Sequence, residues 1–144
     1  MVWGMFDKAM EIAVRAHANQ KDRYGKPYIL HPIRVMMKVA SELEKTVALL
    51  HDIVEDSPWT LDDLIQEGFP EEVVHAVECL TKRENEPYFD YIERVLKDPL
   101  SIRVKIADLE DNMELRRITK LSEKDQDRLE RYHRAWNLLI RGST

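Results

Sequence analysis

Apolar residues recur at intervals of three and four along most of the chain, which is the spacing of helices that bury one face. This spacing predicts a first helix over residues 6–17 and a last helix over residues 122–140. Between them we expect further helices over residues 32–39, 44–56, 60–65, 73–80, 91–96 and 98–113. Glycine and proline, which interrupt helices, number only 4 and 6 in 144 residues. The sequence therefore predicts an all-α fold.

Local signals place two histidines on these helices. Pro32 suits the first turn of a helix, so His31 is expected at the N-cap of the second helix. The third predicted helix, residues 44–56, has an apolar face that includes His51, and this pattern directs His51 inward. The polar segment over residues 19–26 is expected to form an ordered loop before the second helix.

The composition suits one globular domain spanning residues 1–144. An apolar fraction of 44% is too high for a disordered chain, and a charged fraction of 34% is too high for a membrane protein. Cys79 is the single cysteine, so the sequence offers no internal disulfide and no thiolate metal site. The N-terminus lacks a basic segment followed by an apolar core, and no apolar run approaches the ~20 residues that span a bilayer. We therefore expect a cytoplasmic protein without a membrane partner.

The charge balance narrows the choice of ligand. The chain has 22 basic and 27 acidic residues and a net charge of -5, so as a whole it does not attract a long nucleic acid. A phosphorylated small molecule would need a local basic patch.

The end of the third predicted helix carries an unusual cluster of acids. Asp52, Glu55 and Asp56 gather where the helix dipole is negative, although this pole favours cations by about 0.3–1 kcal/mol per charge. A divalent metal would supply the missing positive charge. Glu55 lies one turn after His51, and Asp56 lies one turn after Asp52, so these side chains project from one patch. The segment is equally compatible with a core histidine followed by solvated acids.

Two other segments favour the metal site. His31 stands at a helix start, and Asp108 forms a polar line with Lys105 and Asn112 at intervals of three and four. Alone, these would be a capping residue and a solvated stripe of ion pairs. Together with the pair at residues 51–52, they give the order His, His-Asp, Asp.

With these segments in this order, the chain resembles the HD-domain metal-dependent phosphohydrolases, and among them the hydrolase domain of the RelA/SpoT proteins and its small stand-alone relatives. The matching segments lie between about residues 16 and 115: YGKPYILHP at 24–32, LLHDIVED at 49–56, LTK at 80–82, KIAD at 105–108 and NM at 112–113. The resemblance implies an enzyme with a compact helical HD-domain fold.

The resemblance implies one divalent ion, usually manganese, with four protein ligands: His31, His51, Asp52 and Asp108. Two imidazoles and two carboxylates suit Mn²⁺, Fe²⁺ or Zn²⁺ better than a soft metal. Such an ion lowers the pKa of a bound water and polarises a phosphoryl oxygen. By similarity to the family, Glu55 and Asp56 would orient that water and handle its proton.

The substrate of the family is guanosine 3′,5′-bis(diphosphate) or its pentaphosphate analogue, which is hydrolysed at the 3′ position to release pyrophosphate. Asn112 matches a position that hydrogen-bonds the substrate. Basic side chains near the motifs offer a positive rim for the polyphosphate: Lys21, Arg23, Lys26, Lys82 and Lys105. Each is also compatible with an ordinary surface charge. Since 144 residues leave no room for a synthetase domain beside the hydrolase, hydrolysis is the expected activity.

Two departures from the family pattern leave other interpretations open. Leu109, Glu110 and Asp111 stand where many long members have Arg-Leu-His. Asp22 replaces a residue that is commonly basic, with Arg23 beside it. One alternative is an HD phosphohydrolase of another phosphorylated nucleotide, and the other is a non-catalytic helical binding module that retains the ligand positions.

The other histidines and the tryptophans have settings typical of packing or surface positions. We therefore assign no chemistry to His17, His75, His133, Trp3, Trp59 and Trp136.

Overall fold

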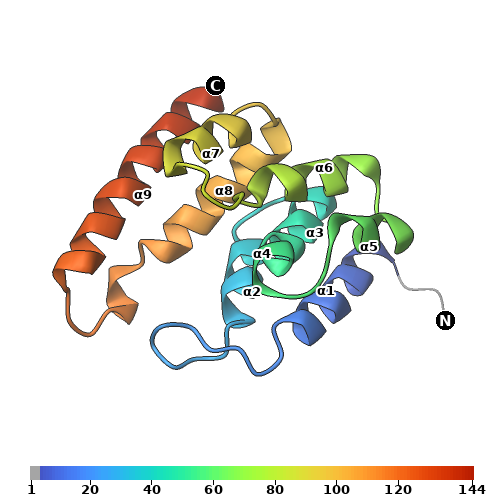
Figure 1. Ribbon diagram of the computed structural model, residues 1–144, viewed down its shortest axis with the longest axis horizontal. Helices are drawn as coiled ribbons and strands as arrows, with labels where there is room; N and C mark the ends of the chain where they lie inside the picture. Colours follow the sequence, from blue (N-terminus) through green and yellow to red (C-terminus); the bar gives the residue numbers. More distant parts are fainter. Residues whose placement is uncertain (1–3) are drawn as a thin grey trace.

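The computed structural model describes residues 4–144, and these residues form nine α-helices, one 3₁₀ helix and no β-strand (Figure 1). The elements are α1 (Met5–Ala16), α2 (Leu30–Met37), α3 (Glu42–Leu50), α4 (Ile53–Asp56), α5 (Leu61–Gln66), α6 (Glu71–Leu80), α7 (Tyr88–Val95), α8 (Pro99–Asn112), η1 (Leu115–Arg117) and α9 (Glu123–Gly142). The predicted all-α fold is confirmed, and the helices share one apolar core.

Helix α3 lies at the centre of this core. Ser41 caps the helix by accepting a hydrogen bond from the amide of Glu44, and all residues over 46–50 are buried. Helices α1, α2, α6 and α8 pack around it. Because α3 is buried on most sides, it needs apolar side chains around its circumference, and the run VALL at 47–50 supplies them. The packing around α3 therefore fixes the position of its C-terminal end, and His51 and Asp52 follow there.

The single helix predicted over residues 44–56 is wrong, because α3 ends at Leu50 and the one-turn helix α4 begins at Ile53. His51 and Asp52 lie in the turn between the two helices. The ring nitrogen Nδ1 of His51 is 2.5 Å from the carbonyl oxygen of Ala48, the acceptor that the amide of Asp52 would use in a continuous helix. The side chain thus competes with the backbone at the point where α3 ends.

The predicted N-cap position of His31 is also wrong. Helix α2 begins at Leu30, so His31 is already a helical residue, and it is buried. The amides of Leu30 and His31 donate to the carbonyls of Pro27 and Tyr28 at 3.2 and 2.9 Å. These two hydrogen bonds form the turn that starts α2. Pro32 lies in the first turn of the helix, where a backbone amide has no helical acceptor, so its missing N–H costs no hydrogen bond.

The loop between α1 and α2 is ordered, as predicted. A carboxylate oxygen of Asp22 accepts hydrogen bonds from the amides of Tyr24 and Lys26, each at 2.9 Å. Gly25 has a positive φ of 79°, a conformation that glycine adopts at little cost. An isolated bridge joins Lys21 to Pro27 at the base of the loop. The acid at position 22 therefore has a structural role in the loop.

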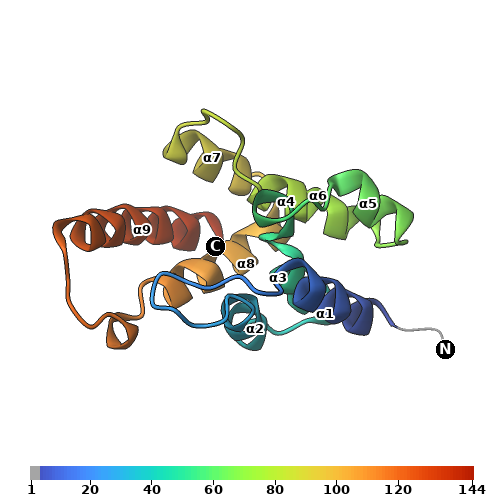
Figure 2. The same cartoon turned by 60° about the horizontal axis from the view of Figure 1, so that its bottom comes forward.

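Helix α9 lies on the side of the molecule away from α1, and α8 runs between α9 and the central helix α3 (Figures 1 and 2). Asp98 caps α8 through the amide of Ser101 at 3.0 Å, with Pro99 in its first turn. Helix α9 packs along α8, and the indole of Trp136 donates to Glu110 at 3.1 Å.

The packing roles of the remaining aromatic and histidine residues agree with the sequence. Trp59 and Trp136 pack against the core, and Trp3 lies outside the described residues. His17 is buried, whereas His75 and His133 are exposed. Over residues 4–144, no helix is long and apolar enough to cross a membrane.

Candidate metal centre

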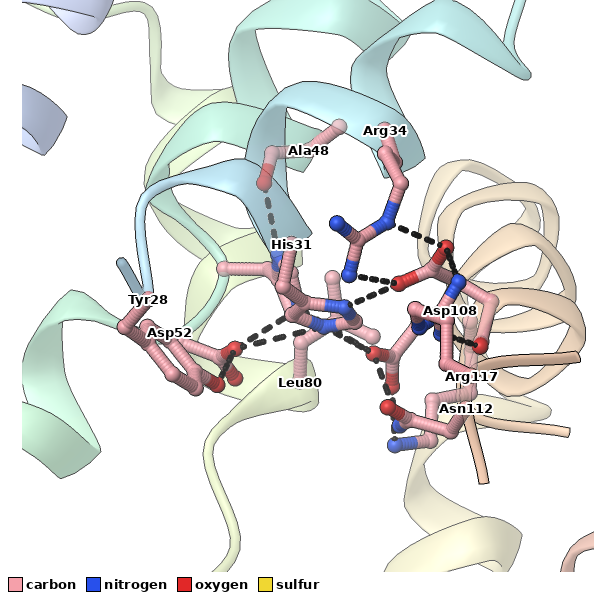
Figure 3. Close-up of polar contacts among 12 residues, drawn as sticks. Tyr28, His31, Arg34, Ala48, Asp52, Leu80, Asp108, Asn112 and Arg117 are labelled. Atoms are coloured by element: carbon pink, nitrogen blue, oxygen red, sulfur yellow. Dashed lines mark hydrogen bonds and ion pairs between the residues drawn. The ribbon is translucent and has the colours of Figure 1, made fainter. Parts of the chain in front are cut away.

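Three of the four predicted ligands, His31, His51 and Asp108, offer donor atoms that all lie within 4.8 Å of one another, and Asp52 contacts both imidazoles. Figure 3 shows His31, Asp52 and Asp108 meeting at this place. Nε2 of His31, from α2, lies 2.8 Å from Oδ1 of Asp108 on α8 and 3.6 Å from Oδ2 of Asp52. Nε2 of His51 lies 3.1 Å from Oδ2 of Asp52 and 3.3 Å from Oδ1 of Asp108. Donor atoms bound at about 2.0–2.2 Å from one ion are separated by roughly 3 Å, so these separations fit a shared cation.

The hydrogen bonds of the two imidazoles also fit a metal. Nδ1 of His51 is 2.5 Å from the carbonyl oxygen of Ala48, and Nδ1 of His31 is 2.7 Å from Oδ2 of Asp111. Each Nδ1 therefore donates a hydrogen bond away from the cluster, so with a metal bound each Nε2 would present its lone pair to the centre. Nε2 of His51 is buried and finds no hydrogen-bond partner among residues 4–144. A buried nitrogen of this kind, between two carboxylates, suits a bound cation.

Neighbouring side chains hold the two carboxylates. Tyr28 donates a hydrogen bond of 2.6 Å to Oδ2 of Asp52. Lys105 reaches Oδ2 of Asp108 at 2.7 Å, and the side-chain amide of Asn112 donates to Oδ1 of Asp108 at 3.3 Å. The polar line that the sequence predicts on α8 is therefore present, and it converges on Asp108.

The electrostatics of the cluster favour added positive charge. Burial alone would lower the pKa of His31, but hydrogen bonds to Asp108 and Asp111 outweigh it and raise that pKa to about 9. The pKa of His51 is also raised, because the attraction of Asp52 and Asp108 overcomes its burial. Burial would raise the pKa of Asp52, but the charge of His51 lowers it. The two carboxylates thus stay ionised and draw a cation, either protons on the imidazoles or a metal.

The two acids after the ligand pair lie on the one-turn helix α4. One oxygen of Glu55 accepts a hydrogen bond of 2.5 Å from the amide of Lys82, the residue that follows α6 by two positions. Partial desolvation, together with the nearby charge of Asp52, raises the pKa of both Glu55 and Asp56 above their ordinary values. The segment at residues 80–82 therefore meets the end of the ligand motif, although the two are far apart in sequence.

A cavity of about 380 Å³ opens beside His31. Of the predicted substrate-binding residues, Arg23 and Asn112 line it, whereas Lys26, Lys82 and Lys105 do not. Lys21, Tyr24, Tyr28 and Tyr132 also contribute to the wall.

Lys105 differs from the surface charge that the sequence suggested. It is 8% exposed, and its ammonium lies 5.1 Å from the centre of the Tyr91 ring as well as on Asp108. Burial would lower its pKa, but the charge of Asp108 holds that pKa well above the ordinary value. The ammonium of Lys105 therefore pairs with the carboxylate of Asp108 and does not line the cavity.

Sequence reasoning missed the residues that support the ligands. Asp111 is 2% exposed and binds His31, and Arg34 lies 2.8 Å from the same carboxylate. The burial of Asp111 would raise its pKa, but hydrogen bonds from His31 and Arg34 lower it to about 2. Position 111 is the last of the three positions that depart from the family pattern. This departure was the one feature of the sequence that could have pointed to Asp111. Arg34 gave none, because its partner lies 77 residues away.

Comparison with known proteins identifies the relatives of the chain. A probable GTP pyrophosphokinase of Mycobacterium leprae is 38% identical over 120 residues, which cover 74% of this chain and 15% of that protein. A guanosine-3′,5′-bis(diphosphate) 3′-pyrophosphohydrolase of Aquifex aeolicus is 36% identical over 118 residues, which cover 74% of this chain and 17% of that protein. The chain is a relative of the RelA/SpoT family. It spans about a sixth of the length of these two RelA/SpoT-type proteins, so the activities in their names belong to much longer chains.

A solved structure shares the RelA/SpoT-type fold. A metazoan orthologue of SpoT that hydrolyses ppGpp matches with a TM-score of 0.79 and 23% identity, covering 100% of this chain and 89% of that chain. At this identity the match establishes the shared helical fold. No family model matches the chain.

Proposed function

We propose that this chain is a metal-dependent phosphohydrolase that cleaves the 3′-pyrophosphate from guanosine 3′,5′-bis(diphosphate), with Mn²⁺ as its ion. The observation that carries the proposal is the convergence of two imidazole Nε2 atoms and two carboxylates, with N–O separations of 2.8–3.6 Å. The ion would be held by His31, His51, Asp52 and Asp108. When bound, it would polarise a phosphoryl oxygen and lower the pKa of a water molecule.

Glu55 and Asp56 are assigned to the attacking water. They lie on α4, separated from the ligand pair by two residues, and the contact of Glu55 with the amide of Lys82 fixes one of the two carboxylates. A fixed carboxylate can orient a water by accepting a hydrogen bond and can then accept its proton. The name of the Aquifex relative supports the hydrolytic direction.

The cavity beside His31 is assigned to the nucleotide. Arg23 offers positive charge for a phosphate, Tyr24 and Tyr132 offer aromatic surface for a base, and Asn112 offers a hydrogen-bond donor. Lys26 and Lys82 do not line this cavity, and their contacts with substrate stay predictions.

A different phosphorylated nucleotide is the second candidate substrate. Asp111 binds Arg34 and Arg117, two arginines that line the cavity, so part of the positive charge there is already neutralised. Fewer free cations favour a ligand with fewer phosphates. The name of the Mycobacterium leprae relative adds synthesis by pyrophosphoryl transfer as an activity to be assayed.

The test is release of pyrophosphate from guanosine 3′,5′-bis(diphosphate) by the purified chain, with Mn²⁺ and with a chelator. We expect Mn²⁺-dependent release, loss of at least about 10³-fold in Asp52→Asn, and full activity in the matched control Asp62→Asn, an exposed acid on α5. Parallel reactions contain other nucleoside phosphates, or ATP with GDP to detect synthesis.

Each other outcome contradicts the proposal in a distinct way. Faster hydrolysis of another nucleoside phosphate would show that guanosine 3′,5′-bis(diphosphate) is not the preferred substrate. Formation of a pyrophosphorylated product from ATP and GDP would show that the chain catalyses synthesis. Failure of the folded wild-type protein to bind Mn²⁺ or any other divalent ion would favour a non-catalytic binding module.

A further inference from the structure

Asp111 lies behind the metal centre. It is one turn beyond Asp108 on α8, and its Oδ2 is 2.7 Å from Nδ1 of His31. The two nitrogens of an imidazole point in nearly opposite directions, and Nε2 of the same ring meets Asp108 at 2.8 Å. Asp111 therefore contacts the ring on the side away from the ligand cluster.

The oxygens of Asp111 are occupied by two arginines as well as by His31. Arg34 donates from Nε to Oδ1 at 2.8 Å and from Nη2 to Oδ2 at 3.1 Å, a two-point contact. Arg117 donates to Oδ1 at 3.3 Å and also contacts the backbone carbonyl of Asp111. With these partners Asp111 has no oxygen left for the centre, so this buried acid is not a fifth ligand.

We propose that Asp111 is a positioning residue that keeps the proton of His31 on Nδ1 and the Nε2 lone pair toward the metal, while Arg34 and Arg117 fix Asp111. The inference rests on the metal centre of the proposed function. A carboxylate behind a ligating imidazole orients the ring and increases its basicity, and loss of such a partner lowers metal affinity by about 10–100-fold.

The charge of Asp111 is compensated from a second helix. A carboxylate that is only 2% exposed needs a cation beside it. Arg34 provides it from α2, the helix that carries His31 three residues earlier. The same helix thus supplies both the ligand and the cation that holds its support.

A purely structural ion pair is the competing explanation, and the two differ in what they change. Arg34→Ala removes a partner of Asp111 but leaves the acceptor of His31 in place. Asp111→Asn removes the charge of that acceptor. If Asp111 acts on the imidazole, metal affinity falls much more in Asp111→Asn than in Arg34→Ala. A structural ion pair predicts a loss of stability in both variants and no selective loss of affinity.

The experiment is calorimetric titration of the whole chain with Mn²⁺, beside thermal unfolding of the metal-free variants. We expect affinity about 10–100-fold weaker in Asp111→Asn, less than threefold weaker in Arg34→Ala, and unchanged in Glu110→Gln, the adjacent acid bound to Trp136. Asp111→Ala is the second variant, because Arg34 and Arg117 are 31% and 28% exposed and can be hydrated.

The inference is overturned if folded Asp111→Asn or Asp111→Ala binds Mn²⁺ as the wild type does, or if Arg34→Ala loses as much affinity. These results leave wild-type metal binding and hydrolysis intact, so the proposed function survives them. Absence of Mn²⁺ binding in the wild type would instead overturn both.

Discussion

The hydroxyl group of Tyr28 donates a hydrogen bond of 2.6 Å to Oδ2 of Asp52, 24 residues further along the chain. Burial is the main cause that raises the pKa of Tyr28, and the charge of Asp52 adds to it, so the phenol stays a neutral donor across the physiological range. Tyr28, two residues before α2, therefore orients the carboxylate of Asp52, two residues after α3. The hydrogen bond couples the position of the loop before α2 to the position of Asp52.

Substitution of Tyr28 by phenylalanine is expected to weaken Mn²⁺ binding. Without the hydroxyl, Asp52 can rotate away from His51, and an affinity loss of about tenfold follows. Calorimetric titration measures it. Tyr24→Phe is the matched control, because Tyr24 lines the same cavity and is 37% exposed. Equal affinity in Tyr28→Phe and the wild type would show that Asp52 is oriented without the phenol.

Metal binding is expected to stabilise the fold. Mn²⁺ at about 100 times its Kd contributes about 2.7 kcal/mol to the native state, which corresponds to a rise in Tm of roughly 5–10 °C. Chelator should reverse the rise. Asp52→Asn should respond much less, whereas Asp62→Asn should respond fully. A rise of equal size in all three proteins would place the ion elsewhere.

Replacement of Lys105 by methionine is expected to destabilise the metal-free protein. Asp108 would lose the ammonium at 2.7 Å and remain 4% exposed, with the imidazole of His31 still at 2.8 Å. Removal of one partner of a buried charge costs up to about 3–5 kcal/mol, and we expect the lower part of this range because His31 compensates part of the charge. Urea unfolding measures the loss, with Lys97→Met as an exposed control. Mn²⁺ should recover part of it, because the ion compensates the same carboxylate. A loss below about 1 kcal/mol would contradict the pairing.

The proximity of His31, His51, Asp52 and Asp108 could be predicted from the sequence, but the turn that carries two of these residues could not. The apolar spacing predicts one helix over residues 44–56. It carries no information about a side chain that takes a backbone hydrogen-bond acceptor away from the helix. His51 makes that contact with Ala48, and the helix ends there. The inward direction of His51 was right even though the helix bounds were wrong.

The support around the ligands was beyond the sequence for a different reason. The partners of Asp111 come from α2 and from η1, and such contacts leave no periodic trace in the chain. Lys105 was predicted as part of a positive rim, because its spacing from Asp108 is the same for an exposed stripe as for a buried pair. Burial decides between these two cases, and burial is a property of the packed fold.

The ion pair between Glu86 and Arg94 gives a pH-dependent contribution to stability. Hydrogen bonds from Arg94 lower the pKa of Glu86 from 4.5 to about 2, and its side chain is 11% exposed. Because the pKa is lower in the folded state, this stability is present above pH 4.5 and is lost as the pH falls toward 2.

We expect Glu86→Gln to be about 1–2 kcal/mol less stable than the wild type at pH 7 and nearly equal to it near pH 2. Urea unfolding across this range checks the prediction. Glu84→Gln, at an exposed acid of the same connection, should follow the wild type throughout. A difference that does not shrink at low pH would mean that the pair is not its source.

The hydrogen bonds that Asp22 makes within its own loop have a consequence for ligand binding. A segment left free in solution would lose about 1–2 kcal/mol of conformational entropy per residue on closing around a ligand. Here the loop is already folded back on itself, with the amides of Tyr24 and Lys26 held at 2.9 Å. That entropy is lost when the protein folds, so a molecule entering the cavity meets a preorganised wall.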